Sequence, residues 1–167
     1  MSNAWIFGDD IDTDVLAPGL YMKGPFEELA RHCLESVDEK FATGVRPGDI
    51  VVAGHNFGIG SSREQAAQAL KTLGVTVVIA RSFGGIFFRN ALNMGLLAVV
   101  CDDVARINAG DDLTVDAHSG VIENKTIGET YQCEPLPPQL MEMVHHGGLV
   151  AHLELTMKNT KKKKKPS

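Results

Sequence analysis

The amino-acid sequence predicts an α/β fold with a parallel β-α-β core that is followed by antiparallel hairpins. Three apolar segments rich in β-branched residues alternate with segments of helical periodicity, which is typical of parallel sheets with crossover helices. Two short segments on either side of a polar turn then indicate a hairpin. The 167 residues, 44% hydrophobic and 22% charged, suit one globular domain and exclude collagen-like and wholly disordered classes.

The first element is a short strand at Trp5–Phe7, and four aspartates follow it within residues 9–14. Asp and Thr side chains bond to nearby backbone groups, so residues 8–14 are expected to form a loop. Apolar residues at helical spacing then predict a short amphipathic helix that begins near Pro25. These apolar residues are Phe26, Leu29, Ala30, Cys33 and Leu34.

The parallel core begins with the apolar strand Ile50–Ala53. A glycine-rich loop at 54–60 leads into residues 61–64 and then into a helix, for which Gly74 is the C-terminal stop. The apolar residues of this helix are Ala66, Ala69, Leu70 and Leu73. Ser61 and Glu64 have the spacing of a capping box, in which the serine side chain caps the helix. The pattern therefore predicts Ser61 at or near the N-cap.

The rest of the chain continues the alternation and then departs from it. The strand Val75–Ala80 is apolar on both faces, so we expect it at the centre of the sheet. The later elements are expected at 86–94 (helix), 96–100 (strand), 113–115 and 120–122 (hairpin arms), 139–144 (helix) and 149–153 (strand).

The net charge of −5 is unevenly distributed along the chain. Lys158 and Lys161–Lys165 supply six of the sixteen basic residues, and no acidic residue follows Met157. A run of like charges repels itself, so the sequence predicts a disordered Lys-rich tail at 158–167, attached to a domain of residues 1–157. An anchor for RNA or an acidic partner is the alternative role of the tail. The acidic domain argues against binding of duplex nucleic acid, which requires clustered basic residues.

The sequence predicts neither a membrane-spanning helix nor a secretory signal. No apolar run approaches the roughly 20 residues of a membrane-spanning helix. No basic patch precedes an apolar stretch at the N-terminus, as it does in a secretory signal. The sequence is therefore expected to be that of a cytoplasmic protein with no membrane association.

The three cysteines, Cys33, Cys101 and Cys133, are far apart and odd in number. Their spacing fits neither a zinc site nor an iron–sulfur ligand set, so we expect reduced thiols that pack as small apolar groups. The adjacent His145 and His146 face different sides of a helix and cannot clamp one metal ion together. No metal site is expected.

The segment that carries most chemical information is 54–65, with the sequence Gly-His-Asn-Phe-Gly-Ile-Gly-Ser-Ser-Arg-Glu-Gln between a strand and a helix. Ligands of α/β sheets bind at this end of the strands. Glycines let backbone N–H groups approach an anion, the helix N-terminus favours negative charge, and Arg63 can contact a carboxylate with two N–H groups. The segment predicts an anion site, and a simple helix cap is the alternative. It lacks the patterns of nucleotide-binding loops and serine hydrolases.

Four segments resemble those of one protein family and occur in the same order. They are Gly8–Asp14, Asn56–Glu64, Ala80–Phe83 and Asn90–Leu97. The family is the small subunit of 3-isopropylmalate dehydratase, which is related to the swivelling C-terminal domain of aconitase. The resemblance extends from about Ile6 to Leu153. Gln65 stands where many relatives have histidine, as in the short archaeal-type branch.

The resemblance implies a β/β/α swivelling domain that forms half of an enzyme. The partner would be a large subunit that holds a 4Fe–4S cluster through its own cysteines, and this chain would bind no cofactor. The reaction implied is a dehydration and rehydration that interconverts 2-isopropylmalate and 3-isopropylmalate in leucine biosynthesis, with one iron as Lewis acid. By resemblance, Ser61 takes the carbon-bound proton, while Ser62 and Arg63 bind a carboxylate of the substrate.

The resemblance also implies where the substrate side chain is selected, namely in the loop after the first strand. That loop contains Leu20-Tyr21-Met22-Lys23-Gly24, in which Lys23 is neither the apolar residue that suits an isopropyl group nor the arginine that suits a further carboxylate. We expect Tyr21, Lys23 and Asn56 to contribute to substrate binding. Asp12, Thr13 and Asp14 are expected to shape their loop or to lie at an interface, and direct contact of Asp12 and Asp14 with substrate or partner is the alternative.

The substrate class and the functional class both remain open at this point. The substrate class of the enzyme is either isopropylmalate, a homoaconitate-like tricarboxylate or a 2,3-dimethylmalate-type acid. A non-catalytic carboxylate-binding module is the alternative from another functional class. Turnover in the presence of a cluster-bearing large subunit distinguishes the enzyme from the module.

Overall fold

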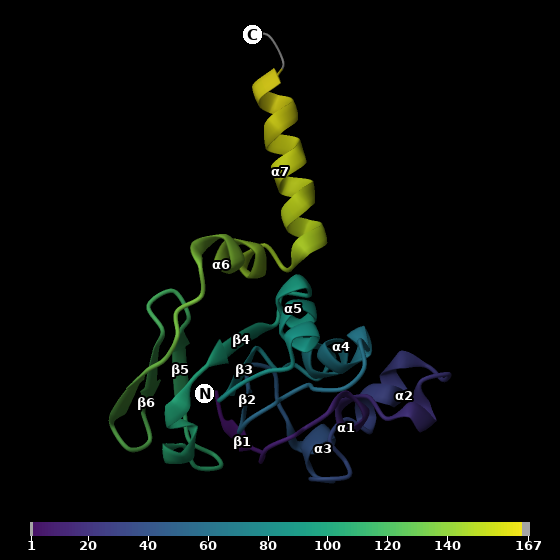
Figure 1. Cartoon of the computed structure of the whole chain (residues 1–167), viewed down its shortest axis with the longest axis vertical. Helices are drawn as coiled ribbons and strands as arrows, with labels where there is room; N and C mark the ends of the chain where they lie inside the picture. The colour runs from purple at the N-terminus through teal and green to yellow at the C-terminus, as the bar shows by residue number, and fades with distance from the viewer. Residues whose placement is uncertain (1, 165–167) are drawn as a thin grey trace.

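The computed structural model describes residues 2–164, and a four-stranded parallel sheet lies at its centre (Figure 1). The strands pair in chain order, with every neighbouring pair parallel. They are β1 (Ala4–Ile6), β2 (Ile50–Ala53), β3 (Val77–Ala80) and β4 (Leu97–Val100). The predicted parallel core is confirmed, and β1 begins one residue earlier than expected.

Helices occupy the connections between these strands and lie together on one side of the sheet (Figure 1). Right-handed crossovers that always step in the same direction place their helices on the same face. The elements are α1 (Thr13–Leu16), the 3-10 turn η1 (Gly19–Tyr21), α2 (Phe26–Arg31), α3 (Phe41–Gly44), α4 (Glu64–Thr72) and α5 (Gly85–Asn93). Every residue of β2 and β3 is buried, as expected for apolar strands in the middle of a covered sheet.

A second, antiparallel sheet lies on the other side of the parallel sheet (Figure 1). It follows the 3-10 turn η2 (Asp102–Arg106) and contains β5 (Leu113–Asp116), β6 (Val121–Asn124) and β7 (Glu129–Gln132) in that order. The hairpin of β5 and β6 is confirmed. The sequence did not reveal β7, because its residues are mostly polar. The buried Tyr131 holds this strand in place, since the Asn124 side chain lies 3.3 Å from its hydroxyl and also bonds to Asp111 (2.8 Å).

The C-terminal elements are helices, α6 (Pro138–His145) and α7 (Leu149–Lys164). The prediction of a strand at 149–153 is wrong. Helix α7 continues to Lys164, within the Lys-rich segment 158–167, and residues 165–167 lie outside the described part. Between Gly148 and Pro166 no glycine or proline interrupts the chain, and most side chains in that stretch are compatible with a helix. Helix α7 projects away from the sheet layers (Figure 1). Among the described residues, no helix is long and apolar enough to cross a membrane.

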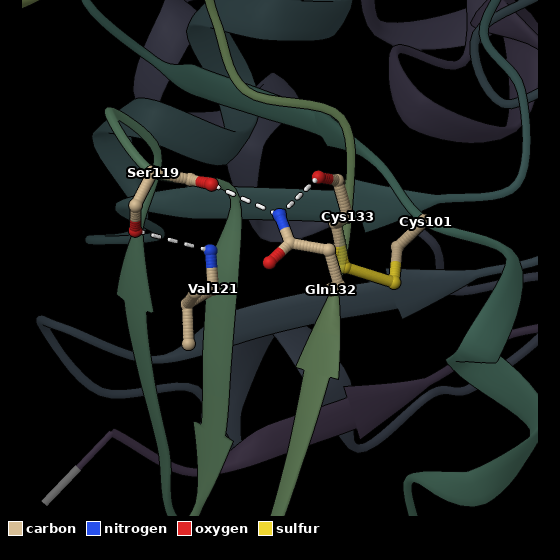
Figure 2. The surroundings of a disulfide bond; sticks show 5 residues. All are labelled: Cys101, Ser119, Val121, Gln132 and Cys133. Carbon is tan, nitrogen blue, oxygen red and sulfur yellow. Dashed lines mark hydrogen bonds between the residues drawn. A yellow bond between two sulfur atoms is a disulfide. The ribbon is translucent and has the colours of Figure 1, made fainter.

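The expectation of three reduced thiols is corrected by a disulfide bond between Cys101 and Cys133 (Figure 2). Cys101 follows β4 and Cys133 follows β7, so the bond joins the two sheets. The Cα atoms of the two cysteines are 4.6 Å apart although the residues are 32 positions apart in sequence. Local spacing of the cysteines cannot predict such a contact. The Gln132 side chain supports this corner by donating to the backbone oxygens of Ser119 (2.9 Å) and Cys133 (3.1 Å). Cys33 remains a free thiol, and burial raises its pKa.

Reduction of the disulfide is expected to lower the free energy of unfolding by about 3–4 kcal/mol, because a cross-link that closes a loop of this length restricts the unfolded chain. Urea unfolding with and without reductant measures the difference. The double variant Cys101→Ala/Cys133→Ala is the control, and its stability should not respond to reductant. Equal stability of the reduced and oxidised wild-type chain would show that the bond contributes nothing.

Candidate functional site

Three loops meet at the carboxyl ends of the parallel strands. The loops after β1, β2 and β3 are joined by backbone hydrogen bonds, so they form one continuous surface at this edge of the sheet. The bonds run from Thr13 N to Ile59 O (2.8 Å), from Gly58 N to Ile11 O (2.6 Å) and from Phe57 N to Ser82 O (3.0 Å). Parallel α/β sheets typically bind ligands at this edge, the carboxyl ends of their strands.

Two glycines allow the central loop to lie against its neighbours. Gly58 has a φ of +81°, and a Cβ atom there would overlap the ring of Phe87 on α5. Gly60 has a φ of +115°, and its Cβ would lie 2.9 Å from Oγ1 of Thr13. Both positions combine a backbone conformation that side chains disfavour with a lack of space. These glycines therefore position the residues that follow them against α1 and α5.

Ser61 is exposed, and its hydroxyl is paired with that of Thr13. The two oxygens are 3.2 Å apart, and the backbone N–H of Ser61 donates to Thr13 Oγ1 at 3.1 Å. Thr13 is only 3% exposed, so its side chain is held by the fold. Because Thr13 Oγ1 accepts the N–H of Ser61, its own hydrogen is free to be donated to Ser61 Oγ.

The prediction that Ser61 caps the following helix is wrong. Helix α4 begins at Glu64, its N-cap is Arg63, and no side chain makes a capping hydrogen bond there. Ser61 instead turns toward Thr13, which a capping-box pattern does not foresee because the partner lies 48 residues away in sequence. Ser62, between Ser61 and Arg63, is exposed.

Arg63 is held by the loop after β1. Its Nη1 donates to Asp14 Oδ1 (2.8 Å) and to the carbonyl oxygen of Ala17 (3.1 Å). Asp14 also accepts from the backbone N–H of Gly19 (3.0 Å). The Arg63 contact, together with this N–H, lowers the pKa of the Asp14 carboxyl below its usual range. Two acceptors, Asp14 Oδ1 and the Ala17 carbonyl oxygen, thus orient a guanidinium group whose remaining N–H groups can bind an anion.

Asp12 and Asn56 shape the backbone of the same loops. Asp12 is the N-cap of α1, and its side chain accepts from Val15 N at 2.8 Å. Asn56 has a φ of +61°, and its side-chain amide donates to Asp10 at 2.9 Å. Asn56 is exposed and lies in the same loop region as Ser61, five residues before it.

Tyr21 and Lys23 lie in and just after the turn η1. Tyr21 ends the turn η1 and stacks flat on His32, with ring centroids 3.6 Å apart and planes 2° apart. Lys23 is exposed in the turn that closes when Gly24 N donates to Tyr21 O (3.2 Å). In the part of the chain that the structure describes, no hydrogen bond or ion pair joins Lys23 to Ser61 or Arg63.

Sequence reasoning assigned no role to four residues that support the site. They are Asp10, Ala17, His32 and Ser82, which contact Asn56, Arg63, Tyr21 and the loop after β2. Asp10 carried a signal as part of the unusual run of aspartates, and Ser82 lies in the segment Ala80–Phe83 that resembles the family. The contribution of Ala17 is a backbone carbonyl, which no residue type reveals.

A parallel sheet with a Gly-Ser-Ser-Arg loop at its edge and an antiparallel sheet on its far face defines the swivel-domain class of the aconitase type. A family model of the aconitase C-terminal domain matches residues 22–103. The crystal structure of 3-isopropylmalate dehydratase from Methanocaldococcus jannaschii is similar with a TM-score of 0.91 and 41% identity, over 97% of each chain.

Curated relatives narrow this class further. A 3-isopropylmalate dehydratase small subunit of Archaeoglobus fulgidus is 53% identical over 151 residues, which are 90% of this chain and 94% of that protein. The small subunit of Methanosarcina mazei is 52% identical, over 89% of this chain and 93% of that protein. A small subunit of Thermotoga maritima is 47% identical, over 90% of this chain and 92% of that protein. The chain belongs to the 3-isopropylmalate dehydratase small-subunit family.

Proposed function

We propose that this chain acts as the small subunit of a 3-isopropylmalate dehydratase, a hydro-lyase of leucine biosynthesis that requires a larger partner. The observation that carries the proposal is the pairing of an exposed Ser61 hydroxyl with the buried Thr13, beside a guanidinium fixed by Asp14. Ser61 and Ser62 are exposed, whereas small ligands are mostly enclosed when bound. A partner that covers this edge would complete the site.

The chemistry proposed for Ser61 is removal of the carbon-bound proton next to a substrate carboxylate. A serine hydroxyl is a weak acid, so the alkoxide needs stabilisation. Thr13 can donate a hydrogen bond to it, and the N-terminus of α4 and the charge of Arg63 lie two to three residues further on. Ser62 and Arg63 would hold the carboxylate and thereby orient the proton toward Ser61.

The residues of this chain do not fit an iron–sulfur cluster. Two of its three cysteines are bonded to each other, and the third is buried alone. We therefore assign the expected 4Fe–4S cluster to the large subunit. The cluster, when bound there, would supply the Lewis acid that assists departure of the hydroxyl group.

We also propose a cytoplasmic location, where a biosynthetic enzyme meets its substrates. A disulfide is unusual in that compartment, apart from the intracellular proteins of hyperthermophiles. The oxidation state of Cys101 and Cys133 in freshly lysed cells is therefore informative about the host compartment.

Reconstitution with a cluster-bearing large subunit under anaerobic conditions tests the proposed function. The assembled enzyme is given 3-isopropylmalate, homoaconitate and 2,3-dimethylmalate, and the products are separated by chromatography. We expect the highest kcat/KM with 3-isopropylmalate. A preference for either other acid would correct the substrate, and carboxylate binding without turnover would favour a binding module.

Replacement of Lys23 with leucine tests whether this residue binds a further carboxylate of the substrate. Lys23 is exposed, so we expect kcat/KM for 3-isopropylmalate to change by no more than about two- to threefold. A lysine that binds a distal carboxylate would instead contribute about 1.5–3 kcal/mol to a tricarboxylate. A loss of tens of fold that is confined to homoaconitate would overturn the choice of 3-isopropylmalate.

A further inference from the structure

A second cluster of chemically active side chains lies outside the loops described above, where α6 meets α7. Glu142 and His146 come from α6 and its C-cap, and His152 comes from the first turn of α7. One ligand atom from each of the three lies within 4.8 Å of the other two. The sequence predicted no metal site, because it showed only the adjacent histidines 145 and 146.

The backbone between the two helices fixes this arrangement. Glu142 and His146 are four residues apart and so share one face of α6. Gly147 and Gly148 then reverse the chain with φ values of +93° and +123°, and His152 N donates back to Gly148 O at 3.0 Å. A side chain at Gly148 would overlap a backbone oxygen at the end of α5. The turn that brings His152 to His146 is therefore tied to the body of the protein.

The two imidazoles present the same nitrogen to each other. Nδ1 of His146 and Nδ1 of His152 are 2.9 Å apart, and the ring planes differ by 22°. Without a cation, one nitrogen must carry a proton and the other must accept it. A metal ion between them uses both lone pairs, and the Glu142 carboxylate supplies negative charge beside it. Both histidines are half-buried and Glu142 is exposed, so an ion can enter from solvent.

We propose that Glu142, His146 and His152 bind one divalent transition-metal ion, of which Zn²⁺ is the best match, and that this ion fastens α7 to α6. Two histidines and one glutamate form a known zinc ligand set that leaves room for water. Imidazole ligands also suit copper and nickel, whereas Mg²⁺ and Ca²⁺ prefer oxygen ligands. The proposal concerns the direction of the projecting helix α7 and is independent of the function of Ser61 (Figure 1).

Calorimetric titration of the full chain with zinc chloride, in a buffer that does not bind metals, tests the proposal. We expect one site, and affinity at least about tenfold weaker in His152→Ala and Glu142→Gln. His145→Ala is the matched control, since His145 adjoins the cluster but does not belong to it. It should bind zinc as the wild type does. Equal binding by all four chains, or none by the wild type, would overturn the assignment.

Amide hydrogen exchange supplies a second measurement that does not depend on the affinity. Zinc should slow exchange along α7 in the wild type and in His145→Ala, and should not do so in His152→Ala. Magnesium chloride at the same concentration should leave exchange unchanged. Protection by both metals, or protection that survives His152→Ala, would contradict a zinc site at this position. Circular dichroism of each variant verifies that the fold is retained.

Discussion

Replacement of Ser61 with alanine is expected to lower kcat of the assembled enzyme by about 10²–10⁴-fold, the usual loss when a general base is removed. The reason is the proposed proton transfer to Ser61 Oγ, for which alanine offers no acceptor. Ser61 is exposed and does not cap α4, so the substitution should leave the fold intact. Steady-state kinetics with 3-isopropylmalate, together with size-exclusion chromatography of the complex, measures both properties.

Variants of Thr13 test whether Ser61 acts as a general base or has only a structural role. Thr13→Ser keeps the hydroxyl that lies 3.2 Å from Ser61 and should retain most activity. Thr13→Val removes that hydroxyl with little change in shape and should lower kcat by about three- to tenfold, the value of one hydrogen bond. Near-normal kcat in Ser61→Ala would show that Ser61 takes no proton.

Replacement of Arg63 with lysine is expected to raise KM by about ten- to a hundredfold, because the charge-assisted contact to a carboxylate contributes about 1.5–3 kcal/mol. An ammonium group has no planar fork of N–H donors. It cannot bind Asp14 and Ala17 in the way that Arg63 does and also contact substrate with two parallel bonds. Initial rates over a range of substrate concentrations separate the change in KM from that in kcat.

The matched control for Arg63 is Asp14→Asn, which keeps the arginine and removes the charge that orients it. A smaller rise in KM is expected, since the Ala17 carbonyl still accepts from Arg63. The pKa of Asp14 is lowered, so its ion pair is present at neutral pH and is lost only as pH falls through that lowered value. Unchanged KM in Arg63→Lys would exclude a carboxylate contact.

The sequence carried enough information for the parallel core but not for the C-terminal region. Runs of β-branched residues such as Ile50–Ala53 have few alternatives to a buried strand. The polar β7 depends on Tyr131 and its partners, and the Cys101–Cys133 bond depends on two sheets that meet in space. Helix α7 begins with apolar residues that suit a strand equally well, so periodicity could not decide its type.

The candidate site shows the same division between local and long-range information. The glycine-rich loop and Arg63 were recognisable because their pattern is local. Thr13 lies 48 residues from its partner Ser61, and Asp14 lies 49 residues from its partner Arg63. Only the fold brings these two loops together. The expected helix cap at Ser61 was wrong for this reason, since a long-range partner outcompeted the local one.

The most direct test of the account compares turnover of 3-isopropylmalate by this chain alone, by the large subunit alone and by the two together under anaerobic conditions. This chain by itself is expected to show no activity, because its cysteines cannot hold a cluster and its site is open to solvent. Activity should arise on mixing, and Ser61→Ala chain added in excess should suppress it by occupying the large subunit. Turnover by this chain alone, or a large subunit that is fully active without it, would contradict the account.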